Sequence, residues 1–268
     1  MAAYPKTSFP HIRATDSVLK IMWKTNAALI PAILGCLFLF PFNALCILAV
    51  SCVTSVLTEI FSRSLFQKKQ TSADGSAILT ALLFAIMLPP SIPSWMAALG
   101  SFTAIFLGKE TFGGLGSSLF NPAVVGFVFL RVCFPWAFHP DFHAMAESLL
   151  IPILIGGLIL IWQKLIRWEI PLTFLMALYV FSLSAGHGLQ SNVLSGSVFL
   201  FSFFILTDSV TAPMTKQGRV LFSMAAAALT VLLSRLSSSM ESMSFTVLIL
   251  NAAGPWFDYV RPEETVVG

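Results

Sequence analysis

The sequence predicts an all-α integral membrane protein of about ten transmembrane helices, arranged as two five-helix repeats of inverted topology. Three observations predict this fold: an apolar composition, basic residues confined to alternate loops, and two interrupted apolar segments. Of the 268 residues, 57% are hydrophobic and 10% are charged, whereas a soluble domain carries roughly 25% charged residues. The net charge of +3 is spread over short loops, so the lipid bilayer is an expected partner and nucleic acid is not.

Ten apolar runs follow one another along the chain, and several are shorter than the roughly twenty residues of a full span. Before them, residues 17–24 mix apolar and basic residues and predict a short interfacial helix. The runs cover about residues 27–42, 44–61, 76–88, 95–107, 122–134, 149–162, 171–183, 196–206, 220–233 and 244–253.

The loop charges predict the orientation. If the N-terminus is cytoplasmic and the chain crosses ten times, thirteen basic residues fall inside and only Arg131 and Arg235 fall outside. Because basic residues concentrate in cytoplasmic loops, this count predicts that both termini are cytoplasmic.

Two apolar runs are interrupted, and they occupy the third and eighth positions. The first follows Asp74-Gly75-Ser76 and ends on Pro89-Pro90, and the second begins at Gly196-Ser197 and is followed by Pro213. Paired interrupted segments in two halves point to a binding site near the membrane midplane. Five spans per half is an odd number, which inverts the second half relative to the first.

Candidate functional residues lie near these interruptions. Asp74 suits the positive end of the first broken helix. In the loop 108–122, glycines permit tight backbone geometry, and Asn121 is expected to cap a helix that starts at Pro122. Such a helix start attracts anions or oxygen-rich ligands, and a compact connecting loop is the alternative interpretation.

Two further acidic residues lie at the ends of apolar runs. Asp208 is unfavourable there unless it is paired or caps a helix, so we expect it to pair with Lys216 or Arg219, or to sit in a charged turn. Glu59 is expected to reach into the membrane interface near Arg63.

No metal site or catalytic set is predicted. The cysteines form no C-x-x-C pair and are interpreted as small buried hydrophobic residues, with a cluster ligand shared with another subunit as the alternative. The outer loop with His139 and His143 is interpreted as solvated rather than metal-binding. The four cysteines are Cys36, Cys46, Cys52 and Cys133.

A series of short motifs runs through nearly the whole chain. They are Phe9-Pro-His11, Asp74-Gly-Ser76 with Leu-Pro-Pro90, Gly108-Lys109, Phe112-Gly-Gly-Leu-Gly116 with Phe120-Asn-Pro122, Ile155-Gly-Gly157, Leu194-Ser-Gly196, Thr207-Asp208 with Val210-Thr-Ala-Pro213, and Gly218-Arg219. In these motifs the chain resembles the D subunit of the Rnf electron-transport complex and its homologue, the B subunit of the sodium-translocating NADH:quinone reductase.

The resemblance implies a urea-transporter-like fold of ten helices in inverted repeats, located in the bacterial cytoplasmic (inner) membrane. It implies a component of a complex, with other membrane and peripheral subunits as partners, that passes electrons from ferredoxin or NADH and translocates Na⁺ or H⁺. Family members usually carry FMN bound covalently through a threonine of a Ser-Gly-Ala-Thr motif on the outer side.

The chain departs from the family at this attachment site. The threonine should precede Glu147-Ser148, but only Phe134 to Ala146 fill the gap, and no Ser-Gly-Ala-Thr occurs anywhere. We therefore expect no covalent FMN, and any FMN or riboflavin to be held non-covalently between the repeats. Ser209 also replaces a proline that is common in the family.

These considerations divide the chain and define a candidate site. The expected segments are a cytoplasmic N-terminal segment 1–26, a first membrane repeat 27–138, a shortened outer loop 139–148, a second membrane repeat 149–255 and a cytoplasmic tail 256–268. The candidate ligand-binding residues are Asp74, Gly75, Ser76, Gly113, Gly114, Gly116, Asn121, Gly196, Asp208 and Thr211.

Two other functions remain open from the sequence. One is a small-solute or ion channel of the same fold without redox chemistry, which the missing flavin motif favours. The other is a membrane scaffold that docks flavoprotein partners.

Overall fold

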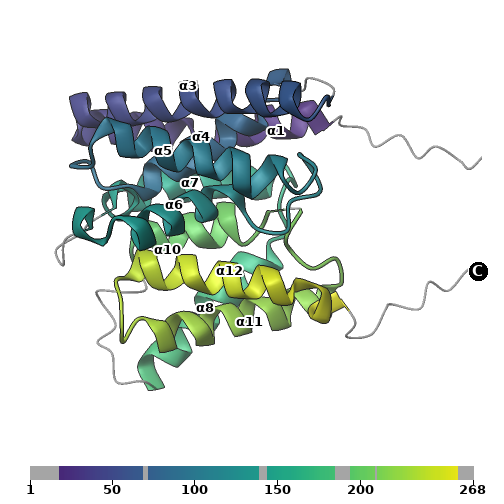
Figure 1. Ribbon diagram of the computed structural model, residues 1–268. Helices are drawn as coiled ribbons and strands as arrows, with labels where there is room; N and C mark the ends of the chain where they lie inside the picture. Colours follow the sequence, from purple (N-terminus) through teal and green to yellow (C-terminus); the bar gives the residue numbers. More distant parts are fainter. Residues whose placement is uncertain (1–17, 69–71, 139–143, 185–193, 209, 259–268) are drawn as a thin grey trace, which may run out of the picture.

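The computed structural model describes residues 18–68, 72–138, 144–184, 194–208 and 210–258, and within these ranges it contains helices and turns but no strand. The outer-loop residues His139 and His143 therefore lie outside the described residues. The long helices run roughly parallel or antiparallel to one another in one bundle, and α1 begins at the same end of the bundle at which α12 ends (Figure 1). Each of the ten apolar runs coincides with a helix, as predicted.

The described part of the first half, residues 18–68 and 72–138, contains six α-helices. α1 (Val18–Ala28) runs into α2 (Ile30–Leu39), and the two together form a 22-residue apolar stretch. The segment expected to form an interfacial helix is thus the first part of a longer helical stretch. The half continues with α3 (Pro41–Leu65), the 3₁₀ turn η1 (Ser72–Asp74), α4 (Ser76–Met87), α5 (Ser94–Ile105), the π-helix η2 (Phe106–Glu110) and α6 (Pro122–Cys133).

The second half follows two short 3₁₀ turns, η3 (Pro135–Ala137) and η4 (Met145–Leu149). It contains α7 (Leu150–Trp162), α8 (Glu169–Ser184), α10 (Gly196–Leu200), the π-helix η5 (Phe201–Ile205), α11 (Lys216–Leu233) and α12 (Ser239–Asp258). Several helices extend beyond the apolar runs because polar residues such as Ser239 and Glu241 continue the helix at its end.

Three neighbour relations occur in both halves. α3 packs against α5 as α8 packs against α11, and α5 packs against α6 as α11 packs against α12. The short helix α4 contacts α6, and the short helix α10 contacts α12. α4 and the α10–η5 segment are nearly all buried, as expected for helices that are apolar on every face and lie inside a bundle.

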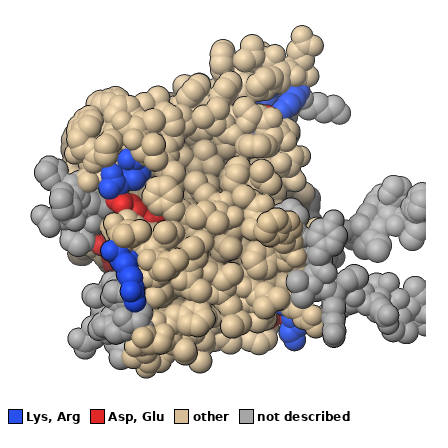
Figure 2. All heavy atoms as spheres, turned by 60° about the horizontal axis from the view of Figure 1, so that its bottom comes forward, with Lys and Arg blue, Asp and Glu red and all other residues tan. Residues whose placement is uncertain are grey.

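The molecular surface is that of a multi-pass membrane protein. Within the ranges that the structure describes, four helical stretches are long and apolar enough to cross a membrane, namely Val18–Leu39, Pro41–Leu65, Met145–Trp162 and Lys216–Leu233. Figure 2 shows charged side chains at the two ends of the molecule and an uncharged belt between them. All six tryptophans are exposed, and all except Trp23 lie in short turns or at or next to helix ends. Tryptophan is enriched at membrane–water interfaces.

Candidate functional site

A cavity of about 310 Å³ lies between the two halves, at the end of the bundle where α4 begins and α7 ends. We call this the inner end and the opposite one the outer end. The cavity is lined by residues of α1, α4, η2, α7 and η5, and by the loops that follow η2, α7 and η5.

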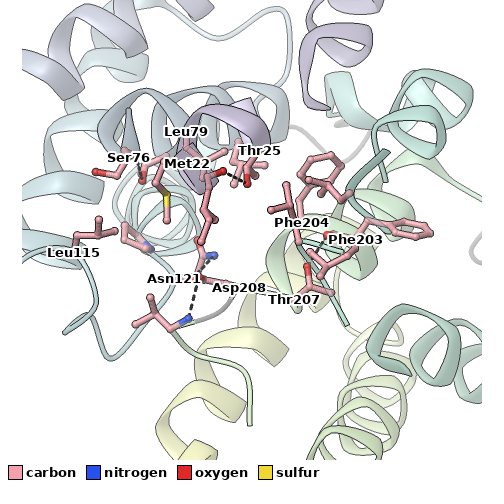
Figure 3. Close-up of a pocket in the computed structure, with 18 of the residues that line it drawn as sticks. Met22, Thr25, Ser76, Leu79, Leu115, Asn121, Phe203, Phe204, Thr207 and Asp208 are labelled. Carbon is pink, nitrogen blue, oxygen red and sulfur yellow. Dashed lines mark hydrogen bonds between the residues drawn. The ribbon is translucent and has the colours of Figure 1, made fainter. Parts of the chain in front are cut away.

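Both interrupted segments border this cavity. α4 contributes Ser76 and Leu79 from its first turn, and η5 contributes Phe203 and Phe204, followed by Thr207. Figure 3 shows Ser76 and Leu79 on one side and the two phenylalanines with Thr207 on the other. The two broken segments therefore border one cavity, but this cavity lies at the inner end of the bundle and not near its middle as predicted, because the start of α4 and the end of η5 meet there.

Asn121 and Asp208 lie between these two sides (Figure 3). Asn121 caps α6 as predicted, because its Oδ1 accepts from the Ala123 N–H at 3.1 Å. Its Nδ2 donates to Asp208 Oδ2 at 3.4 Å, and Asp208 Oδ1 accepts from the Val210 N–H at 3.2 Å. Burial raises the pKa of Asp208, and the Val210 N–H opposes this.

The expected ion pair of Asp208 with Lys216 or Arg219 does not form among the described residues. Arg219 Nη2 instead lies 3.5 Å from Glu169 Oε1, and its Nη1 donates to the Met214 carbonyl at 2.5 Å. The carboxyl group of Asp208 is held by amide donors, which satisfy it without a charged partner.

Four charged residues form a buried cluster beside the cavity, which we call the inner charge cluster: Glu59, Arg63, Lys109 and Glu110. Each is at most 5% exposed. Arg63 Nε lies 3.3 Å from Glu59 Oε1, and Arg63 Nη2 lies 3.2 Å from Glu110 Oε1. Two cations and two anions balance one another, which is required because unpaired buried charges are strongly unfavourable.

The prediction for Glu59 is wrong in one respect. Glu59 does pair with Arg63, but it is fully buried and does not reach the interface. Its Oε1 also binds the ammonium of Lys109 at 2.8 Å. That ammonium comes from η2, which continues α5 and packs against α3.

Lys109 links the inner charge cluster to the start of α4. Its Nζ donates to Ser76 Oγ at 2.6 Å, and Ser76 Oγ donates to Asp74 Oδ1 at 2.5 Å. Asp74 Oδ1 also accepts from the Ser76 N–H at 2.8 Å, as expected for a carboxylate at a helix start. Asp74 and Ser76 are thereby joined to a lysine that borders the cavity.

The remaining candidate residues lie away from the cavity lining. Gly113, Gly114 and Gly116 all have positive φ, and a Cβ on Gly114 would lie 2.9 Å from Arg63 Nη2, so this loop covers the inner charge cluster. Thr211 lies in the turn after Asp208. Gly196 lies at the outer end, where α10 packs against η4.

Sequence reasoning missed Lys109, Gln163 and Thr207 as cavity residues. Gln163 Oε1 is buried without a hydrogen-bond partner. The inner charge cluster could have been predicted from one sequence signal: the Lys109-Glu110 pair at the end of an apolar run, combined with Glu59 and Arg63 one helical turn apart at the end of another. Among the described residues, no group of three or more His, Cys, Asp or Glu could hold a metal ion.

The four cysteines are free thiols. Cys36 is buried as predicted, but Cys46 and Cys52 are only partly buried and Cys133 is exposed.

Comparisons with known proteins agree with this architecture. The chain matches the NQR2, RnfD, RnfE family over residues 6–149 and 141–266. A relative from Clostridium ljungdahlii, named as the D subunit of a proton-translocating ferredoxin:NAD(+) oxidoreductase complex, is 32% identical over 306 residues, which cover 94% of this chain and 92% of the relative.

Two further relatives align over similar lengths. One, from Methanosarcina acetivorans, is named as the D subunit of an ion-translocating oxidoreductase complex; it is 31% identical, over 96% of this chain and 95% of its own. The other, from Acetobacterium woodii, is named as the D subunit of a Na(+)-translocating ferredoxin:NAD(+) oxidoreductase complex. It is 30% identical, and the alignment covers 96% of this chain and 93% of the relative. With both its family motifs and nearly its full length matched, the chain belongs to the NQR2, RnfD, RnfE family.

Proposed function

We propose that the chain is the D subunit of an ion-translocating ferredoxin:NAD⁺ oxidoreductase (Rnf) complex and provides part of its membrane electron and ion route. The observation that carries this proposal is one cavity bordered by both broken helices in a chain whose relatives are named as such subunits. Those relatives are named for H⁺ in one case and Na⁺ in another, so the coupling ion is either Na⁺ or H⁺.

The proposed topology has two inverted five-helix repeats, with both termini on the cytoplasmic side of the bacterial inner membrane. The matching neighbour relations of α3–α5 with α8–α11, and of α4–α6 with α10–α12, support the repeat. The basic residues of α1 and of the α11 start lie at the inner end, which supports the orientation.

Cysteine labelling tests this topology. In a cysteine-free background, a cysteine at exposed Gln217 should react only from the cytoplasmic side, and one at exposed Leu236 only from outside. The reverse pattern would overturn the orientation, and labelling of both positions from one side would overturn the number of crossings between them.

The cavity fits a non-covalent flavin such as riboflavin or FMN. Its volume is at the lower end of the roughly 300–1,000 Å³ of small-molecule pockets. A flavin ring has an apolar edge and a hydrogen-bonding edge, and the cavity offers apolar walls such as Phe204 beside donors such as Lys109. Gln163 Oε1, buried without a partner, could accept from the ring N–H, and a bound flavin would supply electron-carrying chemistry between the two halves.

Covalent FMN on this chain is not part of the proposal. Residues 135–146 contain no Ser or Thr, and the two stretches that match the family meet at residues 141–149, where the shortened loop is expected. Made together with a flavin transferase, the denatured chain should show no in-gel flavin fluorescence at its 29.1 kDa mass. A fluorescent band there would sink this expectation.

The test of the function itself is a coupled assay. Inverted membrane vesicles that contain the complex should couple ferredoxin oxidation with NAD⁺ reduction and ion uptake, and a strain lacking this chain should lose both. Undiminished coupled activity without the chain would contradict the proposal. Solute permeability of vesicles containing only this chain would favour the channel alternative, for which the absent flavin motif is the supporting observation.

A further inference from the structure

Lys109 occupies an unusual position for a buried lysine, because it faces both the inner charge cluster and the cavity. It is 2% exposed and borders the cavity. Its ammonium has three N–H donors. Two of them have acceptors, Glu59 Oε1 at 2.8 Å and Ser76 Oγ at 2.6 Å, and no third protein acceptor is recorded among the described residues.

Both acceptors are themselves held in place. Glu59 is fixed by Arg63 on the same helix, and Ser76 is fixed by Asp74. The ammonium therefore has a defined position at the cavity wall, unlike the mobile head of a surface lysine. Its positive charge is also poorly screened there, because solvent is largely excluded.

Lys164 gives a matched contrast within the same cavity. It borders the cavity at the end of α7, but it is exposed to solvent and makes no ion pair recorded among the described residues. A charge in that environment is screened by water and salt, so its effect on a bound ligand is small.

We propose that Lys109 is a ligand-binding residue that orients the flavin, donating its remaining N–H to an acceptor on the pyrimidine edge of the ring and favouring the reduced ring. This inference rests on the proposed function, which places a non-covalent flavin in the cavity. Reduction adds two electrons and one proton to the oxidised ring and leaves one negative charge on that edge. A fixed ammonium beside it stabilises the reduced form relative to the oxidised form.

The alternative role of Lys109 is only to neutralise Glu59. In that case its removal would change the stability of the fold but neither the affinity for flavin nor the redox potential. Glu59 also pairs with Arg63, so loss of Lys109 does not leave this carboxylate without a cation.

The first measurement is riboflavin binding to the full chain in nanodiscs, followed by quenching of riboflavin fluorescence. Lys109→Met should weaken binding by roughly tenfold to a hundredfold, the usual effect of losing a hydrogen bond from a charged donor. Lys164→Met, which removes the other lysine at the cavity, should bind within about twofold of the unaltered chain.

The second measurement is the midpoint potential of bound riboflavin, at saturating riboflavin, in a titration in which dithionite supplies the electrons and the buffer supplies the proton. Lys109→Met should shift the potential to a more negative value, and Lys164→Met should not. If Lys109→Met fails to fold, the double variant Glu59→Gln/Lys109→Met removes both charges of the pair and should show the same negative shift.

The outcomes separate the two proposals. If the unaltered chain binds riboflavin but Lys109→Met or the double variant keeps its affinity and potential, the role of Lys109 is wrong and the flavin cavity stands. If the unaltered chain binds neither riboflavin nor FMN, both the cavity assignment and the role of Lys109 fail. An equal negative shift in Lys164→Met would show that the effect is not specific to Lys109, and would also overturn the proposal.

Discussion

The starts of the two broken helices share the sequence Gly-Ser but differ in their surroundings. Gly75 and Ser76 begin α4 at the inner end, where Ser76 Oγ binds Lys109 and Asp74 beside the cavity. Gly196 and Ser197 begin α10 at the outer end, where Ser197 Oγ is buried without a partner. One start is built into a polar network, and the other is built for close packing.

The glycines differ in the same way. Gly75 adopts φ +78°, a left-handed conformation that favours glycine, and a Cβ there would meet only side-chain atoms of Asn26 and Trp23 at 3.0 Å and beyond. A Cβ on Gly196 would lie 1.9 Å from the Ala146 carbonyl oxygen. The comparison teaches that one motif can serve ligand chemistry in one half and helix packing in the other.

The largest expected effect is that of Gly196→Ala. The added methyl group would collide with the backbone of Ala146 and Leu150, which cannot move aside without displacing η4 and α7. Overpacking usually costs roughly 1–3 kcal/mol, and we expect Gly196→Ala to exceed this range and to lower the yield of folded chain in detergent.

Gly75→Ala and Gly116→Ala are the controls for that substitution. Both glycines have a positive φ, so an alanine at either position carries about 1–2 kcal/mol of backbone strain. Neither alanine collides with backbone, because the nearest atoms at Gly75 belong to side chains and a Cβ on Gly116 would have no atom within 4 Å. Size-exclusion profiles of heated samples would rank the three variants by the fraction of chain that stays folded. An equal loss of folded chain in Gly75→Ala and Gly196→Ala would contradict the proposed difference between the two glycines.

The serines provide the second prediction. Ser76→Ala removes one acceptor of the buried Lys109 ammonium and one donor to Asp74, and should cost about 1–3 kcal/mol. Ser197→Ala removes a buried hydroxyl that has no partner, so the melting temperature should stay unchanged or rise. A larger loss in Ser197→Ala than in Ser76→Ala would contradict the assignment of the polar network to the inner end.

The contrast also shows what a sequence can predict. The helices that coincide with the ten apolar runs and the Asn121 cap follow from local signals, namely apolar run length and an Asn-Pro pair at a helix start. The inner charge cluster does not, because Glu59 and Lys109 are 50 residues apart in the chain and meet only after α3 packs against η2. Gly75 and Gly196 carry the same local signal, so only their tertiary contacts distinguish them.

The ends of the broken segments also differ, and this gives the smallest expected effect. The C-terminal end of α4 is apolar and leads into Leu88, whose carbonyl accepts a hydrogen bond from the Met145 N–H. The η5 end instead leads to Asp208, whose pKa is raised by burial. A carboxyl group with a raised pKa in the folded state contributes stability that is complete below its unfolded pKa and is lost as pH rises through its folded pKa.

Asp208→Asn should therefore raise the melting temperature at pH 7, where the half-buried carboxylate is unfavourable, and change it little at pH values below the ordinary aspartate range. Asn keeps an acceptor for the Val210 N–H, so the turn itself is preserved. Thermal melts of both chains across this pH range measure the difference. Asp74→Asn is the control and should lose stability at pH 7, because it removes a negative charge from the start of α4 and weakens the charge-assisted bonds from the N–H and hydroxyl of Ser76. Destabilisation by Asp208→Asn at pH 7 would contradict this prediction and would show that the bond from Asn121 Nδ2, which the new amide group cannot accept together with that from Val210, outweighs the cost of the charge.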